Sequence, residues 1–331
     1  MHVVAAPDKF KGTATATEVA RAIARAVAAT GGSCVECPMA DGGEGFLEVL
    51  GGANRRTTVT GPLGDPVEAG WRLERGSAVI EMAAASGLAL AGGPEGNDPM
   101  AASTYGTGEL ILAALESGAR RVLVGVGGSA TTDGGLGALR ALYPSQRLRG
   151  VELVVACDVT TTFVDAAEIF APQKGATPRQ VELLRRRLER LVQVYLDEYG
   201  IDVSAIPCSG AAGGLAGGLA AIGAELRLGF EVVAEEVGLE EKIEGADLVV
   251  TGEGFLDRES FEGKVVGGVV ELAAAAGVPA LAVVGEVFDG MDQRVPTVAL
   301  VERFGEERSR RETAACIEEA VAERLGTRAG R

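Results

Sequence analysis

The segment that decides the fold lies at residues 121–135 and reads RVLVGVGGSATTDGG. Its apolar start predicts a buried β-strand, and residues 136–139 after it can open a helix, so the segment predicts a strand–loop–helix unit. A strand that ends in a glycine-rich loop leaves backbone N–H groups uncovered, and such loops bind anions, phosphate above all. Ser129 and Thr131 add hydroxyl donors, and Asp133 adds a carboxylate that could hold a metal ion.

Three more apolar runs end in the same kind of loop, at residues 8–12, 40–45 and 251–257. Each of these loops combines glycine with Asp, Glu or Lys. In open α/β sheets the ligand binds at the carboxyl ends of the strands. We therefore expect the four loops to form one phosphate and metal site.

The N-terminal region alternates predicted strands and helices. Residues 3–6 and 34–39 have the composition of short buried strands, and helices are expected to follow them from Thr17 and from Phe46. Thr15 or Thr17 can cap the first of these helices. Alternation of strand and helix predicts a parallel sheet.

The middle of the chain has a different pattern. Turns at residues 61–66 and 74–76 separate short strands, which predicts an antiparallel meander. A charged amphipathic helix is expected at residues 180–197, and the parallel pattern returns near Asp247. The meander strands are residues 57–60, 67–73 and 78–82, and the later parallel strands are residues 248–251, 280–284 and 298–301.

These patterns predict two α/β domains. A Rossmann-like domain with a parallel sheet takes both chain ends, residues 1–58 and 226–331. An inserted α/β domain with a mixed sheet takes residues 59–225.

The charge of the chain restricts its ligands. The 331 residues carry a formal net charge of −16. A protein this acidic does not bind nucleic acid or an anionic membrane non-specifically, and it repels ATP and small carboxylates at long range. A site for such ligands must therefore concentrate lysine locally or recruit Mg²⁺. Lysine is scarcer than arginine in this chain, so four lysines near predicted loops stand out: Lys9, Lys11, Lys174 and Lys264.

Cysteine and histidine usage narrows the chemistry further. The odd number of cysteines, five, argues against a disulfide framework and favours a cytoplasmic protein. Cys34 and Cys37 have metal-ligand spacing, but no second pair completes such a site. The only histidine, His2, starts the first predicted strand, so catalysis that needs a histidine base is excluded. We recognise no signal peptide and no membrane-spanning run.

Several motifs together resemble the glycerate kinase family, specifically the bacterial type that makes phosphoglycerate from glycerate and ATP. The resemblance extends from residue 7 to about residue 285. It is carried by the loop at residues 121–135 and by residues 7–12, 39–45, 61–64, 80–88, 103–110, 172–176, 210–215 and 252–264. The resemblance implies the same two-domain plan, with a Rossmann-like domain and a second domain facing it across a cleft. It also implies ATP as co-substrate with Mg²⁺, and glycerate or a close hydroxy acid as acceptor, with 2-phosphoglycerate as the expected product.

Phosphoryl transfer needs positioning and charge neutralisation more than covalent chemistry. Carboxylates at strand ends can hold Mg²⁺ or accept the proton of the substrate, although each could equally cap the helix that follows it. The candidate catalytic residues are Asp8, Lys11, Asp41, Asp158, Lys174 and Asp257. The candidate nucleotide-binding residues are Gly127, Gly128, Ser129, Thr131, Glu253 and Lys264, and the candidate metal ligands are Asp41 and Asp133.

Departures from the family motifs leave the acceptor acid open, and the sequence alone does not give the oligomeric state. They are Lys9 in place of Ser, Thr161 in place of Asn, Phe255 in place of Arg and Glu259 in place of Gln. One hypothesis is that Lys9 replaces the missing arginine cation in holding the substrate carboxylate. One alternative function is a kinase-derived protein that senses a hydroxy acid or nucleotide without turnover. Another is a nicotinamide-dependent oxidoreductase, although the pattern at residues 106–108 lacks the third glycine of a dinucleotide site.

Overall fold

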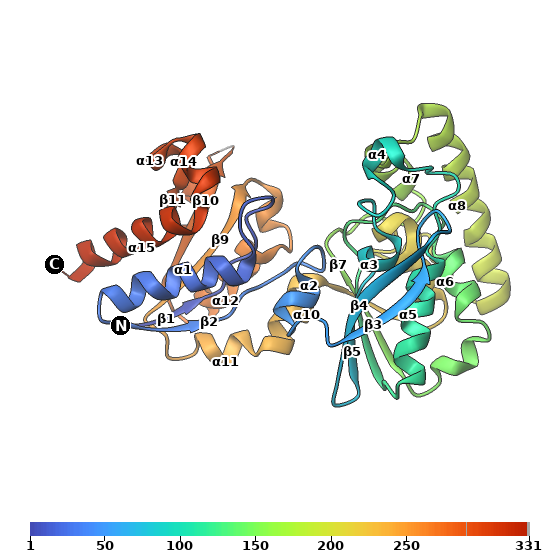
Figure 1. The fold of residues 1–331 in the computed structure, drawn as a ribbon, viewed down its shortest axis with the longest axis horizontal. Helices are drawn as coiled ribbons and strands as arrows, with labels where there is room; N and C mark the ends of the chain where they lie inside the picture. The colour runs from blue at the N-terminus through green and yellow to red at the C-terminus, as the bar shows by residue number, and fades with distance from the viewer. Residues whose placement is uncertain (289, 330–331) are drawn as a thin grey trace. The chain divides into compact units, whose positions relative to one another are not determined.

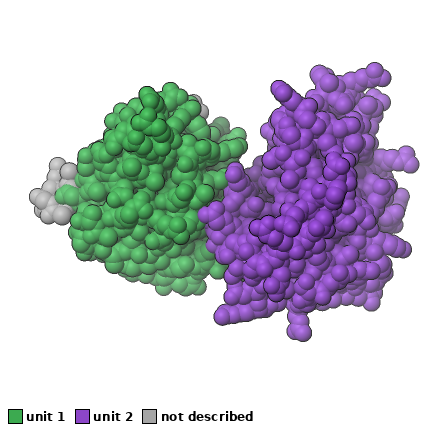
Figure 2. All heavy atoms as spheres, in the orientation of Figure 1, with its two compact units in different colours: residues 1–41, 230–331 green, residues 42–229 purple. Residues whose placement is uncertain are grey.

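The computed structural model describes residues 1–288 and 290–329, and these residues form two compact units (Figure 1). Unit 1 combines Met1–Asp41 with Phe230–Arg331, and unit 2 is the intervening segment Gly42–Gly229. Figure 2 colours unit 1 green and unit 2 purple. Both chain ends therefore belong to one unit, and the other unit is an insertion.

Unit 1 is built on a parallel sheet with five described strands in the order β11-β10-β9-β1-β2. The strands are β1 (His2–Ala5), β2 (Ser33–Glu36), β9 (Leu248–Leu256), β10 (Ala280–Val287) and β11 (Thr297–Ala299). The helices are α1 (Ala16–Ala29), α10 (Gly229–Val237), α11 (Leu239–Ile243), α12 (Val265–Ala275), α13 (Leu300–Phe304), α14 (Glu306–Arg311) and α15 (Thr313–Ala329).

Helices cover both faces of this sheet, as an all-parallel sheet requires. On one face, Val3 of β1 and Val250 of β9 are buried against α1 and α15, which lie side by side (Figure 1). On the other face, Val266 of α12 packs against Val284 of β10. Helix α1 begins at Ala16, one residue before the predicted start at Thr17. Thr15, one of the two predicted caps, accepts a hydrogen bond from the N–H of the third helical residue in a capping box.

Unit 2 is built on a mixed sheet with six described strands in the order β3-β4-β5-β6-β7-β8. The first three strands are antiparallel, and β5 to β8 are parallel. The strands are β3 (Arg55–Thr60), β4 (Pro66–Glu74), β5 (Ser77–Glu81), β6 (Arg121–Gly125), β7 (Glu152–Cys157) and β8 (Glu225–Leu228). The helices are α2 (Phe46–Val49), α3 (Ala83–Ser86), α4 (Gly93–Gly96), α5 (Tyr105–Glu116), α6 (Leu136–Ala141), α7 (Ala166–Phe170), α8 (Pro178–Tyr199) and α9 (Leu215–Ala221).

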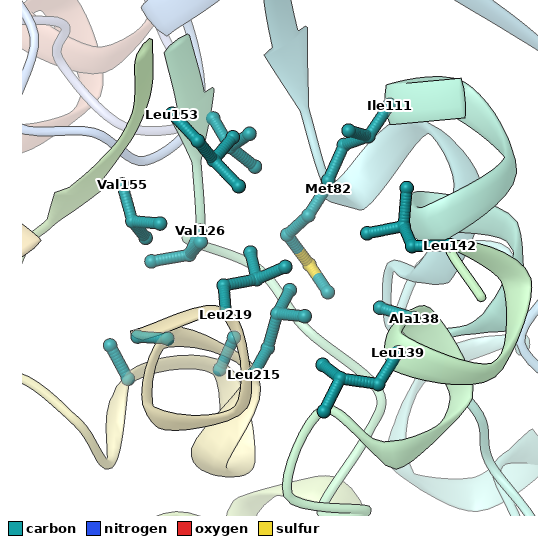
Figure 3. Packing of buried hydrophobic residues seen from close by; sticks show 14 of the residues in the cluster. Met82, Ile111, Val126, Ala138, Leu139, Leu142, Leu153, Val155, Leu215 and Leu219 are labelled. Atoms are coloured by element: carbon teal, nitrogen blue, oxygen red, sulfur yellow. The ribbon is translucent and has the colours of Figure 1, made fainter. Parts of the chain in front are cut away.

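One buried cluster joins the helices of unit 2 to its sheet. Figure 3 shows Met82, directly after β5, among side chains that include Leu142 at the end of α6 and Leu215 of α9. These three side chains are almost completely buried. The strand–loop–helix segment quoted first is therefore β6, its loop and α6, and it is fixed by packing on both sides.

The predicted fold class is confirmed: a parallel sheet formed from both chain ends and an inserted mixed-sheet α/β segment. The strand expected at residues 298–301 is wrong at its end, because β11 stops at Ala299 and Leu300 opens α13. The sequence-based domain limits, residues 58/59 and 225/226, stay predictions beside the compact units, which divide after Asp41 and after Gly229.

Candidate active site

The carboxyl ends of β1 and β9 form the topological switch point of unit 1. Strand β2 lies on one side of β1, and β9, β10 and β11 follow on the other side. Ligands of open α/β sheets bind in the crevice at such a reversal of strand order. The N–H of Asp8 donates to the carbonyl oxygen of Gly252 at 2.8 Å, so Asp8 and the end of β9 are adjacent.

Asp8 is a buried carboxylate next to two other charges. One of its oxygens accepts a 2.7 Å hydrogen bond from the Lys9 N–H, and Lys9 Nζ lies 3.5 Å from the same oxygen and 3.8 Å from Asp41 Oδ1. Burial raises the pKa of Asp8 from 3.8 to about 6, against the opposing charge of Lys9, and the nearby Asp41 carboxylate raises it further. Asp8 can therefore exchange a proton near neutral pH.

Glu253 of β9 is the second carboxyl group at this switch point. Its Oε1 atom is buried and has no hydrogen-bond partner. Burial raises the pKa of Glu253 from 4.5 to about 7, and the charge of Asp8 adds to that increase. A buried carboxyl oxygen without a donor is costly to the fold, so its presence marks a place where a ligand group or a metal ion can bind.

Asp257 and Lys264 lie on the segment that follows β9. Asp257 Oδ1 accepts a 3.1 Å hydrogen bond from the Ser260 N–H, so one of its oxygens binds the backbone of the short 3₁₀ helix Glu259–Phe261. Lys264 Nζ lies 3.1 Å from Glu259 Oε2, one of the positions that depart from the family motif. Asp41 and Asp257 both act electrostatically on Lys264, which places all three near the same charged cluster of unit 1.

Unit 2 places Lys174 under the glycine-rich loop. Its side chain is buried, and Nζ donates to Ser129 Oγ at 2.8 Å and to the Thr131 carbonyl oxygen at 2.6 Å. Burial lowers the pKa of Lys174 from 10.5 to about 7, against the opposing charges of Asp133 and Asp158. An ammonium has three donors, so these two contacts leave one N–H bond for a ligand.

Asp133 holds the loop together from within. Its two oxygens accept hydrogen bonds from the N–H and hydroxyl of Thr104 and from the N–H groups of Gly135 and Gly137, at 2.9–3.1 Å. A carboxylate with so many donors has little capacity left for a metal ion. No group of three potential His, Cys, Asp or Glu ligands lies close enough to hold a metal among the residues that the structure describes.

Close packing, more than exposure, explains several of the glycines. A Cβ on Gly127 would lie 2.4 Å from the Cα of Gly43, and one on Gly213 would lie 2.0 Å from the carbonyl oxygen of Thr131. Thr131 itself is fully buried, and its hydroxyl donates to the Ala212 carbonyl oxygen. Gly128, by contrast, is exposed, whereas Gly127 is half-buried and its N–H donates to the Gly42 carbonyl oxygen at 3.2 Å. Gly128 is therefore the part of the predicted Gly127–Gly128 pair that a ligand can reach.

The structure also assigns residues that the sequence did not single out. Asn97 donates from Nδ2 to the carbonyl oxygens of Ala130 at 3.0 Å and Lys174 at 2.9 Å, and its Oδ1 is buried without a partner. Thr104 binds Asp133 from a neighbouring segment. Thr104 lies within a family-like motif, which was a usable signal, whereas nothing in the local sequence distinguishes Asn97.

The remaining candidates lie at strand ends. Asp158 follows β7, and Lys11 lies in the loop after β1, where its side chain is exposed. Phe255 lines a cavity of unit 1 together with Lys11, and Lys9 does not line it. The structure therefore gives no support to the hypothesis that Lys9 replaces the arginine missing at Phe255.

Comparison with known proteins shows which proteins this chain is similar to. The model of the "Glycerate kinase family" matches residues 3–145 and 143–325. The glycerate 2-kinase of Escherichia coli (strain K12) is 40% identical, with 87% of this chain and 86% of that protein covered. The glycerate kinase of Halalkalibacterium halodurans is 38% identical, with 88% and 87% covered. A crystal structure assigned as glycerate kinase 2 from Salmonella typhimurium LT2 aligns over 100% of this chain and 99% of its own, with 33% identity and a TM-score of 0.84.

These matches cover nearly the whole chain and include its catalytic-type motifs in both units. They make the protein a phosphotransferase with an alcohol group as acceptor. Named relatives that are kinases give no support to the alternative of a sensor without turnover. The chain belongs to the glycerate kinase family.

Proposed function

We propose that this protein transfers the γ-phosphoryl group of ATP to the 2-hydroxyl of D-glycerate and forms 2-phosphoglycerate and ADP. The observation that carries the proposal is a pair of neighbouring carboxyl groups at the switch point of unit 1, the buried Asp8 and Glu253, whose Oε1 atom is buried without a partner. Family membership and the 40% identity with a glycerate 2-kinase support the acceptor and the position.

The proposal gives Glu253 the role of proton acceptor. Its unpartnered Oε1 takes the proton of the glycerate 2-hydroxyl. The hydroxyl oxygen of glycerate bonds to the γ-phosphorus of ATP, and the bond between the γ-phosphorus and the oxygen of the β-phosphate breaks. A pKa of about 7 suits a base that works near neutral pH. Asp8 stays next to it as the second carboxyl group, and Lys9 balances its charge.

Mg²⁺ fits the oxygen donors of unit 1 better than those of unit 2. Asp41 is half-buried beside Asp8, and the region holds a carboxyl oxygen without a donor, whereas the oxygens of Asp133 are already engaged. Asp41 would therefore hold Mg²⁺, since the ion usually takes one or two carboxylates plus phosphate oxygens. When bound, Mg²⁺ neutralises phosphate charge. We propose a structural role for Asp133.

Lys174 supplies the charge of unit 2 in this proposal. Its third N–H bond and the N–H group of the exposed Gly128 can donate to an anionic group of a substrate. Because the ammonium is held by neutral oxygens, its charge is not cancelled by a directly bonded carboxylate in the part of the chain that the structure describes. Asp158 acts on it from a distance.

The direct test is turnover by the purified protein. D-Glycerate with MgATP should release ADP, and ³¹P NMR of the product should show 2-phosphoglycerate and not 3-phosphoglycerate. EDTA should abolish the reaction. Full activity without a divalent ion would contradict the metal-assisted mechanism, and ADP release that does not depend on any hydroxy acid would contradict the kinase.

The proposal places the reaction in the cytoplasm, which the odd cysteine count supports. Within the described residues, no helix is both long and apolar enough to cross a membrane.

A further inference from the structure

A cavity of about 620 Å³ opens at the carboxyl ends of three strands of unit 1. It is lined by the loop after β1, by the ends of β9 and β10, and by residues of α13 and α14. We call it the α14 groove. Cavities of roughly 300–1,000 Å³ hold ligands of drug or nucleotide size, and the ends of parallel strands are where such ligands bind. A three-carbon hydroxy acid is far smaller than this space.

The walls of the α14 groove are apolar and aromatic. Phe10 and Leu300 are buried beneath it, and the ring of Phe255 is 46% exposed at its edge. Phe255 lies against Phe288, with ring centroids 5.9 Å apart and planes at 33°. Two exposed aromatic rings in contact are unusual on a protein with 4% aromatic residues, and such a surface suits stacking of a flat base.

The groove also carries positive charge in a chain of net charge −16. Lys11, Arg310 and Arg311 line it, against the two carboxylates of Glu286 and Glu307. Arg310 lies 3.5 Å from Glu286, and Arg311 lies 3.1 Å from Glu307, so these four charges form pairs. Among the described residues, the ammonium of Lys11 has no such partner and can bind an anion.

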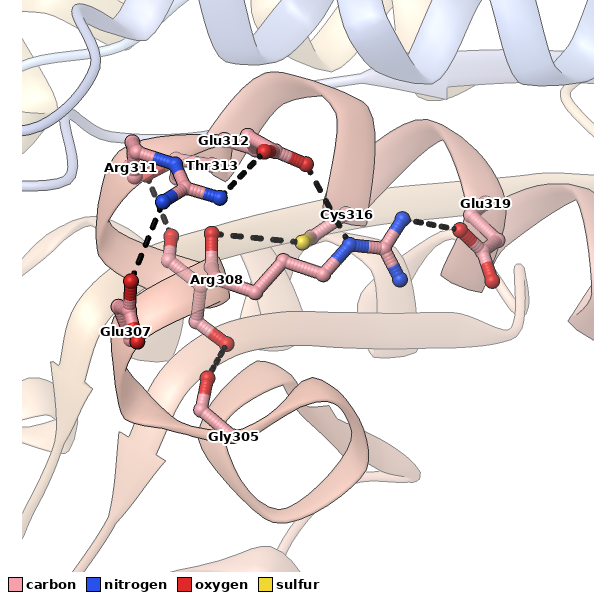
Figure 4. Close-up of polar contacts among 9 residues, drawn as sticks. Gly305, Glu307, Arg308, Arg311, Glu312, Thr313, Cys316 and Glu319 are labelled. Carbon is pink, nitrogen blue, oxygen red and sulfur yellow. Dashed lines mark hydrogen bonds and ion pairs between the residues drawn. The ribbon is translucent and has the colours of Figure 1, made fainter.

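Helix α14 is held firmly enough to form a wall. Figure 4 shows Arg311 between Glu307 and Glu312, and Arg308 between Glu312 and Glu319 of α15. These contacts tie α14 to α15, which packs on the sheet. The groove is therefore a preformed feature of unit 1.

We propose that the α14 groove binds the purine base and ribose of a nucleotide, with Phe255 as the stacking surface and Lys11 as a phosphate contact. This inference rests on the proposed kinase function and adds to it the place where the nucleotide co-substrate binds. The acidic side chain of Glu286 faces the same space and can accept a hydrogen bond from an exocyclic amino group.

The test compares two phenylalanines of nearly equal exposure. Phe255→Leu removes the ring from the groove, and Phe288→Leu is the matched control because that ring, 44% exposed, does not line it. Calorimetric titration with MgADP should show about tenfold weaker binding for Phe255→Leu, wild-type binding for Phe255→Tyr, and a change under about threefold for Phe288→Leu. The KM for glycerate should stay unchanged in all three variants.

Two smaller ligands, each a part of the nucleotide, test the base-binding and phosphate-binding parts of the groove separately. Adenosine should lose affinity with Phe255→Leu only, and pyrophosphate should lose affinity with Lys11→Ala only. Equal ADP binding by wild type and Phe255→Leu would overturn the inference, as would wild-type protein that binds no ADP. If the wild type binds ADP in this pattern but phosphorylates no hydroxy acid, the kinase proposal fails and the nucleotide groove stands.

Discussion

The two units handle buried charge in opposite ways. In unit 1, Asp8 and Glu253 are neighbouring carboxyl groups, and an oxygen of Glu253 has no donor. In unit 2, Lys174 is a single buried ammonium, and neutral oxygens of Ser129 and Thr131 accept its hydrogen bonds. Burial raises the pKa of both acids and lowers the pKa of the lysine, so the pKa values of all three groups lie closer to neutral pH than usual.

The buried charged groups of the two units are of two kinds. Some stabilise the fold, and others lower its stability. Asp133 in unit 2 is buried, and its oxygens accept hydrogen bonds from Thr104, Gly135 and Gly137. Glu253 and Lys174 lack complete partners, and an incompletely paired buried charge costs stability. Such groups are the ones expected to act on a substrate.

The largest effect is expected for Glu253→Gln. The change keeps the size of the side chain and removes the proton acceptor, so kcat should fall roughly a thousandfold with only small changes in both KM values. Steady-state ADP release measures this. Glu259→Gln is the control, since that side chain is 71% exposed and should tolerate the change. A near-wild-type kcat of the Glu253→Gln variant would show that Glu253 is not the proton acceptor.

Lys174→Met should reduce kcat/KM about a hundredfold, because one charge-stabilising contact is lost. Stability should be kept, since burial of the ammonium is costly and methionine fills a similar volume. Thermal melting followed by circular dichroism, together with kinetics, checks both parts. Arg186→Met on the exposed face of α8 controls for loss of a cation. If activity and melting temperature fall together, Lys174 has a structural role only.

Asp133→Ala should lower the free energy of unfolding by about 3 kcal/mol, because the donors of Thr104, Gly135 and Gly137 lose a charged partner. Urea denaturation of the variant and of Asp197→Ala, an exposed change on α8, gives the comparison. Unchanged stability in Asp133→Ala would mean that the loop does not depend on this carboxylate, and would reopen its candidacy as a metal ligand.

The smallest effect is on the pH dependence of stability, and it has opposite signs in the two units. The pKa of Glu253 is raised from 4.5 to about 7, so its contribution to stability is full below pH 4.5 and is lost as pH rises toward 7. The pKa of Lys174 is lowered from 10.5 to about 7, so its contribution is full above pH 10.5 and is lost as pH falls toward 7.

Urea midpoints measured from pH 4.5 to 10.5 test this. In the wild type, stability should fall as pH rises from 4.5 to 7, and Glu253→Gln should make this fall smaller. Asp8, with a pKa of about 6, will leave part of the fall in place. Stability should also fall as pH is lowered from 10.5 to 7, and Lys174→Met should make that fall smaller. Identical pH profiles for the wild type and both variants would show that burial does not shift the pKa of Glu253 or of Lys174.

The sequence predicted the elements of this site better than their roles. Asp8 follows an apolar run, and that local pattern was enough to place it after β1. For Glu253 the predicted strand end was wrong, because β9 continues to Leu256 and Glu253 lies within it. The same pattern treated Asp133 as a metal candidate, because nothing local reveals that Thr104, 29 residues earlier, donates to it. Asn97, whose partners lie 33 and 77 residues away, left no signal at all.

The sequence by itself determined the fold class, the parallel sheet from both chain ends and the family, because hydrophobic period, glycine positions and motif order are properties of neighbouring residues. Only the tertiary structure decided which charges are buried, which of them have partners, and that Lys9 lies between Asp8 and Asp41. Burial and pairing depend on segments far apart in the chain, and they shift a pKa through desolvation and through charges that only the folded chain brings close.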